Sequence, residues 1–240
     1  MRLLERHANT QTENLKTAPS ESLMQITTKE QAKRYYYDQW RSMPGAPSEW
    51  QNNYSERNHP GREVAAGFVP DGSSLLEVAC GIGVDYPRYR VKGVKYFGVD
   101  LTEKYVAEAQ QRGVPCKVAD ALNLPFADNS FDSVYCKDLL VHLPPGDWKT
   151  VLSEMARVCR DRVIVLDHAF EEKTRYLLCE SYKGETGDLY FYSNVYSAKE
   201  VEAYMDAFGF SMEQYQTGSI VVGSVVQANI VTVFTRRKQT

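Results

Sequence analysis

The stretch that most constrains the fold is an apolar run that ends in a glycine turn, LLEVACGIG at residues 75–83. The next apolar run closes on Asp100, seventeen residues after Gly83. A strand can carry the chain to the edge of a sheet, where Gly81 and Gly83 let the backbone turn tightly and approach a ligand. An acidic side chain at the end of the following strand can then bind ribose hydroxyls. The pattern therefore predicts the nucleotide-binding first half of an α/β sheet.

The same turn departs from the motif that binds dinucleotides. That motif needs a third small residue, three positions after the second glycine, so that helix and strand can pack closely. Tyr86 stands at that position. The turn therefore argues against NAD and FAD as ligands.

Strand and helix patterns alternate from residue 75 onward. Apolar runs at 75–79, 96–100, 116–119, 132–136 and 162–167 are separated by helical patterns, which is typical of a parallel sheet. Two further runs, near 211–216 and 228–235, leave no room for a crossover helix, so we expect an antiparallel hairpin beside the parallel strands.

Capping signals mark the predicted helices. A capping box at Thr27-x-x-Glu30 predicts a helix that contains Tyr35 to Trp40 and ends at Pro44, and a second box at Ser197-x-x-Glu200 predicts a helix that ends at Gly209. Between them, Thr102 is expected to cap a helix that Gly113 ends, and apolar residues at helical spacing predict another helix over 148–158.

Length and composition indicate one domain. The 240 residues suffice for a single α/β domain but not for two. We expect a flexible tail at 1–25, a domain at 26–240, and lid elements at about 27–60 and 169–196. The polar N-terminal stretch lacks the apolar core of a signal peptide, and no apolar run approaches the ~20 residues that cross a bilayer.

Charge and cysteine usage narrow the partners and the compartment. A net charge of −3 disfavours nucleic acid as a partner. The five cysteines form no C-x-x-C pair, so neither zinc nor a disulfide framework is indicated. Cysteines within apolar patterns behave as small hydrophobes, which favours a reducing cytoplasm.

Four segments carry a resemblance to a known family. They are EVACGIG at 77–83, FGVD at 97–100, DALNLPFADNSFD at 120–132 and HLP at 142–144. Together they resemble class I S-adenosylmethionine-dependent methyltransferases, and the LPF-x-D-x-SFD run is similar to the branch that methylates small molecules, quinone-biosynthesis enzymes among them. The resemblance spans about residues 73–170 and returns weakly at 197–235. It implies a Rossmann-like sandwich with a seven-stranded, mostly parallel sheet. Ala79 replaces the usual glycine, from which we expect a slightly tighter turn.

The resemblance also implies cofactor contacts. Glu77 would orient the turn and reach the methionyl amino end, although a buried glutamate that bonds backbone amides is the alternative. Asp100 would accept both ribose hydroxyls, with helix capping as the alternative that Thr102 makes unnecessary. Asp120 would accept a hydrogen bond from the exocyclic amine of adenine, with a turn-forming aspartate as the alternative. The complete implied set is Glu77, Ala79, Cys80, Gly81, Gly83, Asp100, Leu101, Asp120, Ala121, Cys136 and Lys137.

The general base is less well defined. His142 matches a position that often lines the family's active site, and its ordinary pKa near 6.5 suits proton abstraction, although it could equally be a residue that packs and caps a helix. Asp167 and His168 end the fifth predicted strand and form a second candidate pair. Asp138 could contribute to a metal site, but the motif that surrounds such sites in the family is missing, so we expect no metal.

Aromatic residues indicate where an acceptor would bind. Tyr37, Trp40, Tyr192 and Tyr196 belong to two tyrosine-rich segments that the family resemblance places over the substrate. Aromatic rings can stack on flat acceptors and exclude water. The alternative is that they pack the lid itself or a dimer interface.

These observations predict transfer of a methyl group from S-adenosylmethionine to a small molecule, with oxygen, nitrogen or carbon as the acceptor atom. The alternative from another class is a regulatory or scaffold protein that binds S-adenosylmethionine without catalysis. A nucleic-acid or protein methyltransferase is a third reading, but the N-P-P-Tyr motif of enzymes that methylate flipped bases is replaced by CKDL at 136–139. The identity of the acceptor and a homodimeric state are left open.

Overall fold

The computed structural model describes residues 29–42, 60–168, 173–174, 178–184, 187–192, 194–222 and 225–238. The helices are α3 (Lys29–Arg41), α5 (Pro60–Gly67), α6 (Tyr86–Val91), α7 (Glu103–Gln111), α8 (Asp147–Val158) and α9 (Ala198–Asp206), with a 3-10 turn η2 (Leu140–His142). The strands are β1 (Ser74–Val78), β2 (Lys95–Asp100), β3 (Cys116–Val118), β4 (Phe131–Lys137), β5 (Cys159–His168), β6 (Leu178–Gly184), β7 (Gly187–Tyr192), β8 (Phe210–Val222) and β9 (Val225–Arg236). The predicted tail, the capping box at Thr27 and the helix end at Pro44 lie outside the described residues.

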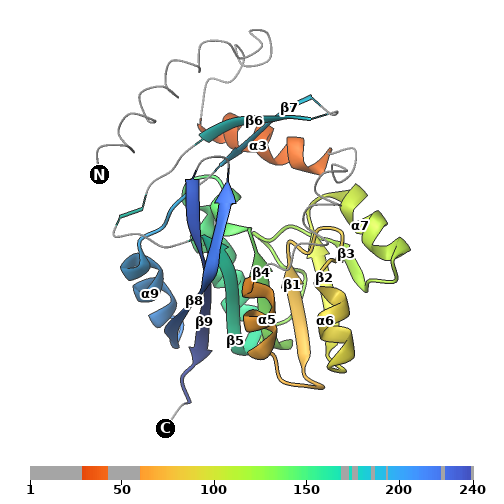
Figure 1. The fold of residues 1–240 in the computed structure, drawn as a ribbon, viewed down its shortest axis with the longest axis vertical. Coiled ribbons are helices and arrows are strands. Elements are labelled where there is room, and N and C mark those ends of the chain that lie inside the picture. The colour runs from red at the N-terminus through yellow and green to blue at the C-terminus, as the bar shows by residue number, and fades with distance from the viewer. Residues whose placement is uncertain are drawn as a thin grey trace.

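Seven strands form one sheet in the order β3-β2-β1-β4-β5-β9-β8 (Figure 1). Strands β1 to β5 run parallel, as the alternating pattern predicted. The predicted antiparallel hairpin is also confirmed, because β9 pairs antiparallel with β5 and β8 pairs antiparallel with β9. Its strands are longer than predicted and pair from Phe210–Arg236 to Val222–Val225.

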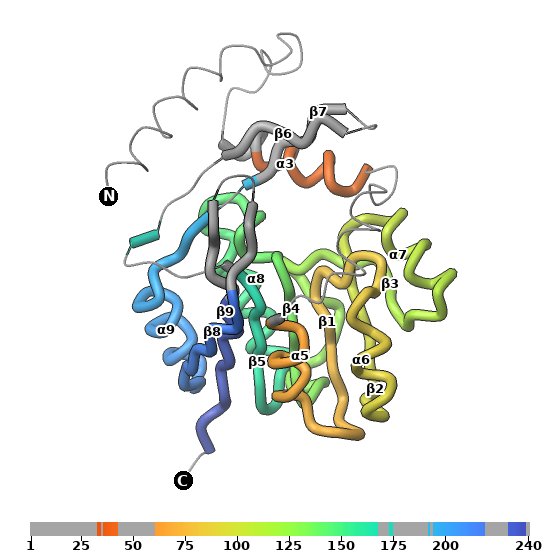
Figure 2. Tube along the Cα trace, in the orientation of Figure 1, coloured from red at the N-terminus to blue at the C-terminus, as the bar shows by residue number. Residues whose placement is uncertain are grey.

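The sheet is buried on both faces because successive side chains of each strand point to opposite sides. In β1, Leu75 packs into a cluster with α5, α6 and α7, whereas Leu76 and Val78 pack into a cluster with α8 and α9. Figure 2 shows the resulting layers, with α5 lying against strands from the far end of the chain. A parallel sheet covered on both faces explains why its strands read as continuous apolar runs.

One predicted helix cap is confirmed and one is wrong. The Ser197 side chain accepts a hydrogen bond from the Glu200 amide at 3.5 Å and begins α9. Thr102 stands at the N-cap of α7, but its side chain makes no capping bond. Its hydroxyl instead donates to the carbonyl of Trp40 at 3.0 Å, because α3 passes close to this point.

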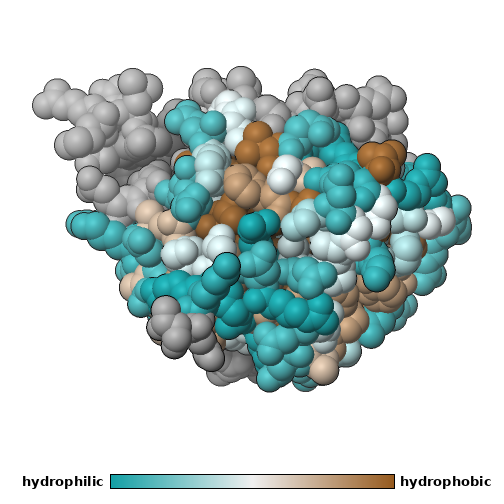
Figure 3. Space-filling model, turned by 90° about the horizontal axis from the view of Figure 1, so that it is seen from below, coloured by the Kyte–Doolittle hydropathy of each residue, from teal (hydrophilic) through white to brown (hydrophobic). Residues whose placement is uncertain are grey.

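Above the carboxyl edge of the sheet lie α3 and a separate antiparallel pair, β6 and β7 (Figure 1). The sequence pattern did not predict this pair. The face seen from the opposite side is mostly hydrophilic, with smaller hydrophobic areas (Figure 3). Across the described residues, no helix combines the length and the hydrophobicity that a membrane span requires.

Candidate active site

A pocket opens at the carboxyl edge of the sheet, where the strand order reverses between β1 and β4. Ligands of open α/β sheets bind in the crevice at such a switch point. The pocket has a volume of about 140 Å³. Its walls are Tyr36, Tyr37, Trp40, Val78, Ala79, Val99, Asp100, Leu101, Thr102, Tyr105, Ala119, Asp120, Ala121, Leu122, Asp138, Leu139, His142 and Leu143.

The turn after β1 uses left-handed backbone at three positions. Ala79, Gly81 and Gly83 have φ values of 60°, 53° and 75°. A Cβ on Gly83 would stand 2.6 Å from a methyl group of Val114, so this glycine is required by close packing as well as by its backbone. Alanine at position 79 adopts the same left-handed conformation without glycine's freedom, which makes it a point of backbone strain.

Asp100 holds this turn against the start of α7. One carboxylate oxygen accepts the Gly81 amide and the other accepts the Thr102 amide, each at 2.8 Å. The side chain is 9% exposed, and burial raises the pKa of Asp100 against the lowering effect of these amides. Asp100 also lines the pocket, so its carboxylate borders any ligand bound there.

Glu77 lies inside β1, below the pocket rather than in its wall. It accepts a hydrogen bond from the Tyr96 hydroxyl at 2.7 Å. Burial, followed by the negative charge of Asp85, raises the pKa of Glu77 well above its ordinary value. Cys80, Gly81 and Gly83 form the adjacent turn and likewise do not line the pocket.

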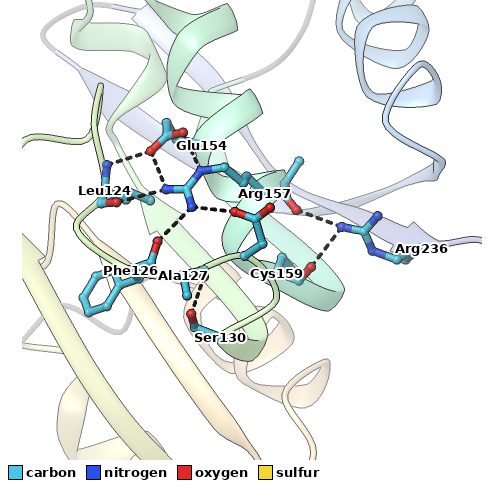
Figure 4. Close-up of polar contacts among 10 residues, drawn as sticks. Leu124, Phe126, Ala127, Ser130, Glu154, Arg157, Cys159 and Arg236 are labelled. Atoms are coloured by element: carbon cyan, nitrogen blue, oxygen red, sulfur yellow. Dashed lines mark hydrogen bonds and ion pairs between the residues drawn. The ribbon is translucent and has the colours of Figure 1, made fainter.

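The loop after β3 is held by α8, and this explains the long motif there (Figure 4). Arg157 donates to the carbonyls of Leu124 and Phe126 at 2.9 and 2.8 Å. It also pairs with Asp128 at 2.9 Å and with Glu154, whose carboxylate accepts the Leu124 amide. These bonds fix the loop by its backbone, so the LPF-x-D-x-SFD run has a structural role.

The same loop presents Asp120, Ala121 and Leu122 to the pocket. One oxygen of Asp120 accepts the Leu122 amide at 2.9 Å, as expected of a turn-forming aspartate. The other pairs with Arg41 of α3 at 3.2 Å. Asp120 therefore links the loop after β3 to the helix above the pocket.

His142 ends η2 and lines the pocket. Its Nδ1 lies 2.7 Å from the carbonyl oxygen of Tyr192. A carbonyl can only accept, so Nδ1 carries the proton and Nε2 is the basic nitrogen of the neutral ring. Burial lowers the pKa of His142 below its ordinary 6.5. The ring is therefore neutral at pH 7.

Asp138 lines the pocket, whereas Asp167, Cys136 and Lys137 lie outside its wall. Asp167 is buried and accepts the Val141 amide at 3.3 Å, so it holds the turn that carries His142. The described side chains do not include His168. Cys136 is in the hydrophobic core, and Lys137 pairs with Asp138.

Helix α3 forms the wall opposite the sheet and is tied to the first turn of α8. The buried carboxylate of Asp147 accepts the Tyr37 hydroxyl at 2.6 Å and the Lys33 ammonium at 2.5 Å. The Tyr36 hydroxyl donates to the carbonyl of His142, and its ring meets that of Tyr192 at 5.0 Å between centroids.

The predicted aromatic residues are divided between two places. Tyr37 and Trp40 line the pocket. Tyr192 does not line it but contacts two residues that do, His142 and Tyr36. Tyr196 is 2% exposed in the core, packs on Trp148 and donates to the carbonyl of Leu140.

Sequence reasoning missed Asp147 and Tyr105 as residues of this region, whereas Tyr36 belongs to the aromatic run from Tyr35 to Trp40 that was expected there. Asp147 carries no sequence signal beyond its place in the first turn of a helix, since its partners are 114 and 110 residues away. Among the described residues, no cluster of three or more His, Cys, Asp or Glu side chains could hold a metal ion.

Comparison with known proteins agrees with this architecture. Residues 75–162 match a family model described as a methyltransferase domain. Over 109 residues the chain is 37% identical to the O-methyltransferase resE of Aspergillus sclerotiorum, covering 41% of this chain and 40% of that protein. Over 89 residues it is 37% identical to a demethylmenaquinone methyltransferase of Corynebacterium urealyticum, covering 37% and 38%. The matches thus span well under half the length of these relatives.

A solved structure extends the likeness beyond the matched segment. The 1,6-didemethyltoxoflavin-N1-methyltransferase of Burkholderia thailandensis, with bound 1,6-didemethyltoxoflavin and S-adenosylhomocysteine, superposes with a TM-score of 0.60 at 14% identity. The superposition covers 86% of this chain and 88% of that one, which shows a shared fold. Residues 75–162 therefore match a methyltransferase domain, and the described chain shares the fold of this solved methyltransferase.

Proposed function

We propose that this protein transfers a methyl group from S-adenosylmethionine to a small-molecule acceptor. The observation that carries the proposal is one pocket at the switch point that joins two carboxylates, Asp100 and Asp120, to a neutral histidine and an aromatic wall. The two carboxylates suit a nucleoside, and the histidine with the aromatic wall suits an acceptor. The relatives support methyl transfer, but their names cover different acceptors.

The residues around the glycine turn fit the cofactor. Asp100 lines the pocket and can accept hydrogen bonds from ribose hydroxyls, and the left-handed turn at Ala79 to Gly83 lies next to the pocket. We assign adenine recognition to Asp120, Ala121 and Leu101, and orientation of the turn to Glu77. The carbonyls of Cys136 and Lys137 remain our candidates for the methionyl ammonium.

When bound, the cofactor supplies an electrophilic methyl group on a sulfonium. The acceptor must present a lone pair in line with that methyl, and a hydroxyl acceptor must also lose its proton. His142 fits the role of base because the Tyr192 carbonyl fixes its proton on Nδ1 and burial keeps the ring neutral. We assign Asp167 a positioning role, since it holds the backbone of η2.

We propose that the aromatic face of α3 forms the acceptor side, with Tyr36, Tyr37 and Trp40 as its wall. The pocket of about 140 Å³ is smaller than the roughly 300–1,000 Å³ of most small-molecule sites, and we propose that this wall moves when a ligand enters. Helix α3 is joined to the body mainly by side chains, which makes it the movable part. A flat, mostly uncharged acceptor suits such a wall.

The domain limits stay part of this proposal, with one domain at 26–240 and lid elements at about 27–60 and 169–196. We also propose a cytoplasmic location, because four cysteines of the described chain are free and buried. The net charge of −3 continues to disfavour nucleic acid as a substrate.

Two experiments test the function. Calorimetric titration with S-adenosylmethionine and with NAD should show binding of the first alone. Transfer of isotope-labelled methyl should then be measured on a panel of phenols, aromatic amines and quinone precursors. Binding without turnover across the panel would favour the non-catalytic alternative, and binding of NAD instead would overturn the cofactor assignment.

A further inference from the structure

Tyr105 in the first turn of α7 carries a buried hydroxyl that the proposed roles do not use. The side chain is 6% exposed and lines the pocket. Within the described part of the chain, its hydroxyl has no hydrogen-bond partner. Buried polar groups nearly always have a partner, and one without a partner costs about 1–3 kcal/mol. A phenylalanine would pack against Ile82 and Trp40 equally well without that cost.

Tyr105 and Asp100 line the same pocket. Because side chains of a helix lean toward its N-terminus, we expect the Tyr105 ring to lie over the turn that begins at Thr102. Asp100 accepts a hydrogen bond from the amide of Thr102, so the Asp100 carboxylate lies at that same turn. Burial and, after it, the charge of Asp100 raise the pKa of Tyr105, so the hydroxyl keeps its proton and is available as a donor.

The chemistry of a ribose bound to Asp100 calls for such a donor. An ionised carboxylate only accepts hydrogen bonds, so each ribose hydroxyl donates its hydrogen bond to Asp100. The lone pairs of each hydroxyl oxygen then still need a donor. The nearby Thr102 hydroxyl already donates to the carbonyl of Trp40. We propose that the Tyr105 hydroxyl donates a hydrogen bond to a ribose hydroxyl oxygen of the bound nucleoside and so contributes to cofactor recognition. This inference rests on the proposed function, because it assigns a residue of the same site.

The experiment compares Tyr105→Phe with a matched control, Tyr135→Phe. Tyr135 is also fully buried, its hydroxyl also has no partner among the described residues, and it does not line the pocket. Calorimetry would measure binding of S-adenosylhomocysteine and of its 2′-deoxy and 3′-deoxy analogues. We expect Tyr105→Phe to weaken binding of the parent compound about 3- to 10-fold, as for loss of one neutral hydrogen bond.

The deoxy analogues separate a hydrogen bond from packing. One of the two analogues should bind wild type and Tyr105→Phe equally, because it lacks the oxygen that the hydroxyl contacts. Tyr135→Phe should bind all three compounds as wild type does. Neither variant should unfold at a lower temperature without ligand, since each loses a hydroxyl that has no protein partner.

Equal binding of S-adenosylhomocysteine by wild type and Tyr105→Phe would overturn the inference. So would an equal loss for the parent and both analogues, which would mean that Tyr105 acts by packing or on another group of the nucleoside. These results leave the proposed function intact. If wild type bound neither S-adenosylhomocysteine nor S-adenosylmethionine, the proposed function itself would fail, and this inference with it.

Discussion

The two halves of the pocket are built in different ways. On the nucleotide side, backbone amides of nearby residues, Gly81, Thr102 and Leu122, hold Asp100 and Asp120, and Arg41 adds one side-chain pair to Asp120. On the acceptor side, contacts between side chains join α3 to α8, through Lys33 and Tyr37 on Asp147.

This difference separates what the fold fixes from what it leaves variable. Backbone amides are present whatever the side chain, so the nucleotide side needs few particular residues once the strands and turns have formed. The acceptor side depends on pairs of side chains that are more than 100 residues apart. We infer that the acceptor side sets specificity and moves during binding, whereas the nucleotide side is preorganised.

Removing the basic nitrogen of His142 should produce the largest effect on turnover. This effect should be confined to the acceptor side. For a hydroxyl acceptor, we expect His142→Gln to lower kcat about 10²- to 10⁴-fold while cofactor affinity changes little. Because burial lowers the pKa of His142, the neutral base persists below pH 6.5, and the acid limb of the wild-type rate should lie below that value.

Rates measured from pH 5 to 8 test this expectation. The same depressed pKa predicts that the stability contribution of His142 is complete above pH 6.5 and is lost as pH falls below it, because the unfolded chain then binds the proton more readily. Full turnover in the glutamine variant, or an acid limb above pH 6.5, would rule out His142 as the base.

Asp100 tests the nucleotide side. We expect Asp100→Ala to weaken binding of S-adenosylmethionine by about 100-fold or more, since charged hydrogen bonds contribute roughly 1.5–3 kcal/mol each and two ribose hydroxyls are involved. It should also lower stability, because the amides of Gly81 and Thr102 lose their acceptor.

A matched variant separates the two effects of Asp100. Asp132 accepts the amide and hydroxyl of Ser74 at the opposite edge of the sheet, so Asp132→Ala should lower stability without changing cofactor affinity. Calorimetry and thermal unfolding of both variants decide the matter. Unchanged affinity in folded Asp100→Ala would remove Asp100 from the site.

Asp147 tests whether the attachment of α3 to α8 supports the acceptor side more than the nucleotide side. We expect Asp147→Ala to release Lys33 and Tyr37 and to lower turnover by about tenfold through misplacement of the aromatic wall, with cofactor affinity within about twofold of wild type. Arg34→Ala is the control, because Arg34 is an exposed residue of the same helix that pairs with Asp38 at 3.8 Å. A comparable loss of cofactor binding and turnover would mean that the two halves are not separate.

The same distinction explains how much the sequence could predict. The parallel strands, the glycine turn and Asp100 are encoded by local apolar runs and by residues with special backbone freedom, so pattern reasoning found them. The Thr102 cap was predicted incorrectly, because a local rule does not include the carbonyl of Trp40 arriving from α3. Asp147 and the β6–β7 pair depend on contacts between distant segments and left no local pattern.

Tyr196 shows the same limit from the other side. Its place in a tyrosine-rich segment indicated a substrate contact, but burial against Trp148 and a bond to the Leu140 carbonyl decide its position. Composition identifies a residue type that suits a pocket, whereas only packing determines which of several tyrosines lines it.

The smallest expected effect concerns the strain at Ala79. A left-handed conformation costs a non-glycine residue about 1–2 kcal/mol, and the greater freedom of glycine in the unfolded chain costs about 0.4–1 kcal/mol. Ala79→Gly should therefore raise the free energy of unfolding by up to about 1 kcal/mol, as measured by denaturant titration without ligand.

Gly81→Ala is the reciprocal control, because its φ is 53° and a Cβ there would meet nothing within 4 Å. It should lower stability by at least a comparable amount without any steric clash. A stabilised Ala79→Gly with unchanged cofactor affinity would show that this strain is not needed for binding, whereas weakened binding would mean that the Ala79 side chain itself supports the nucleotide side.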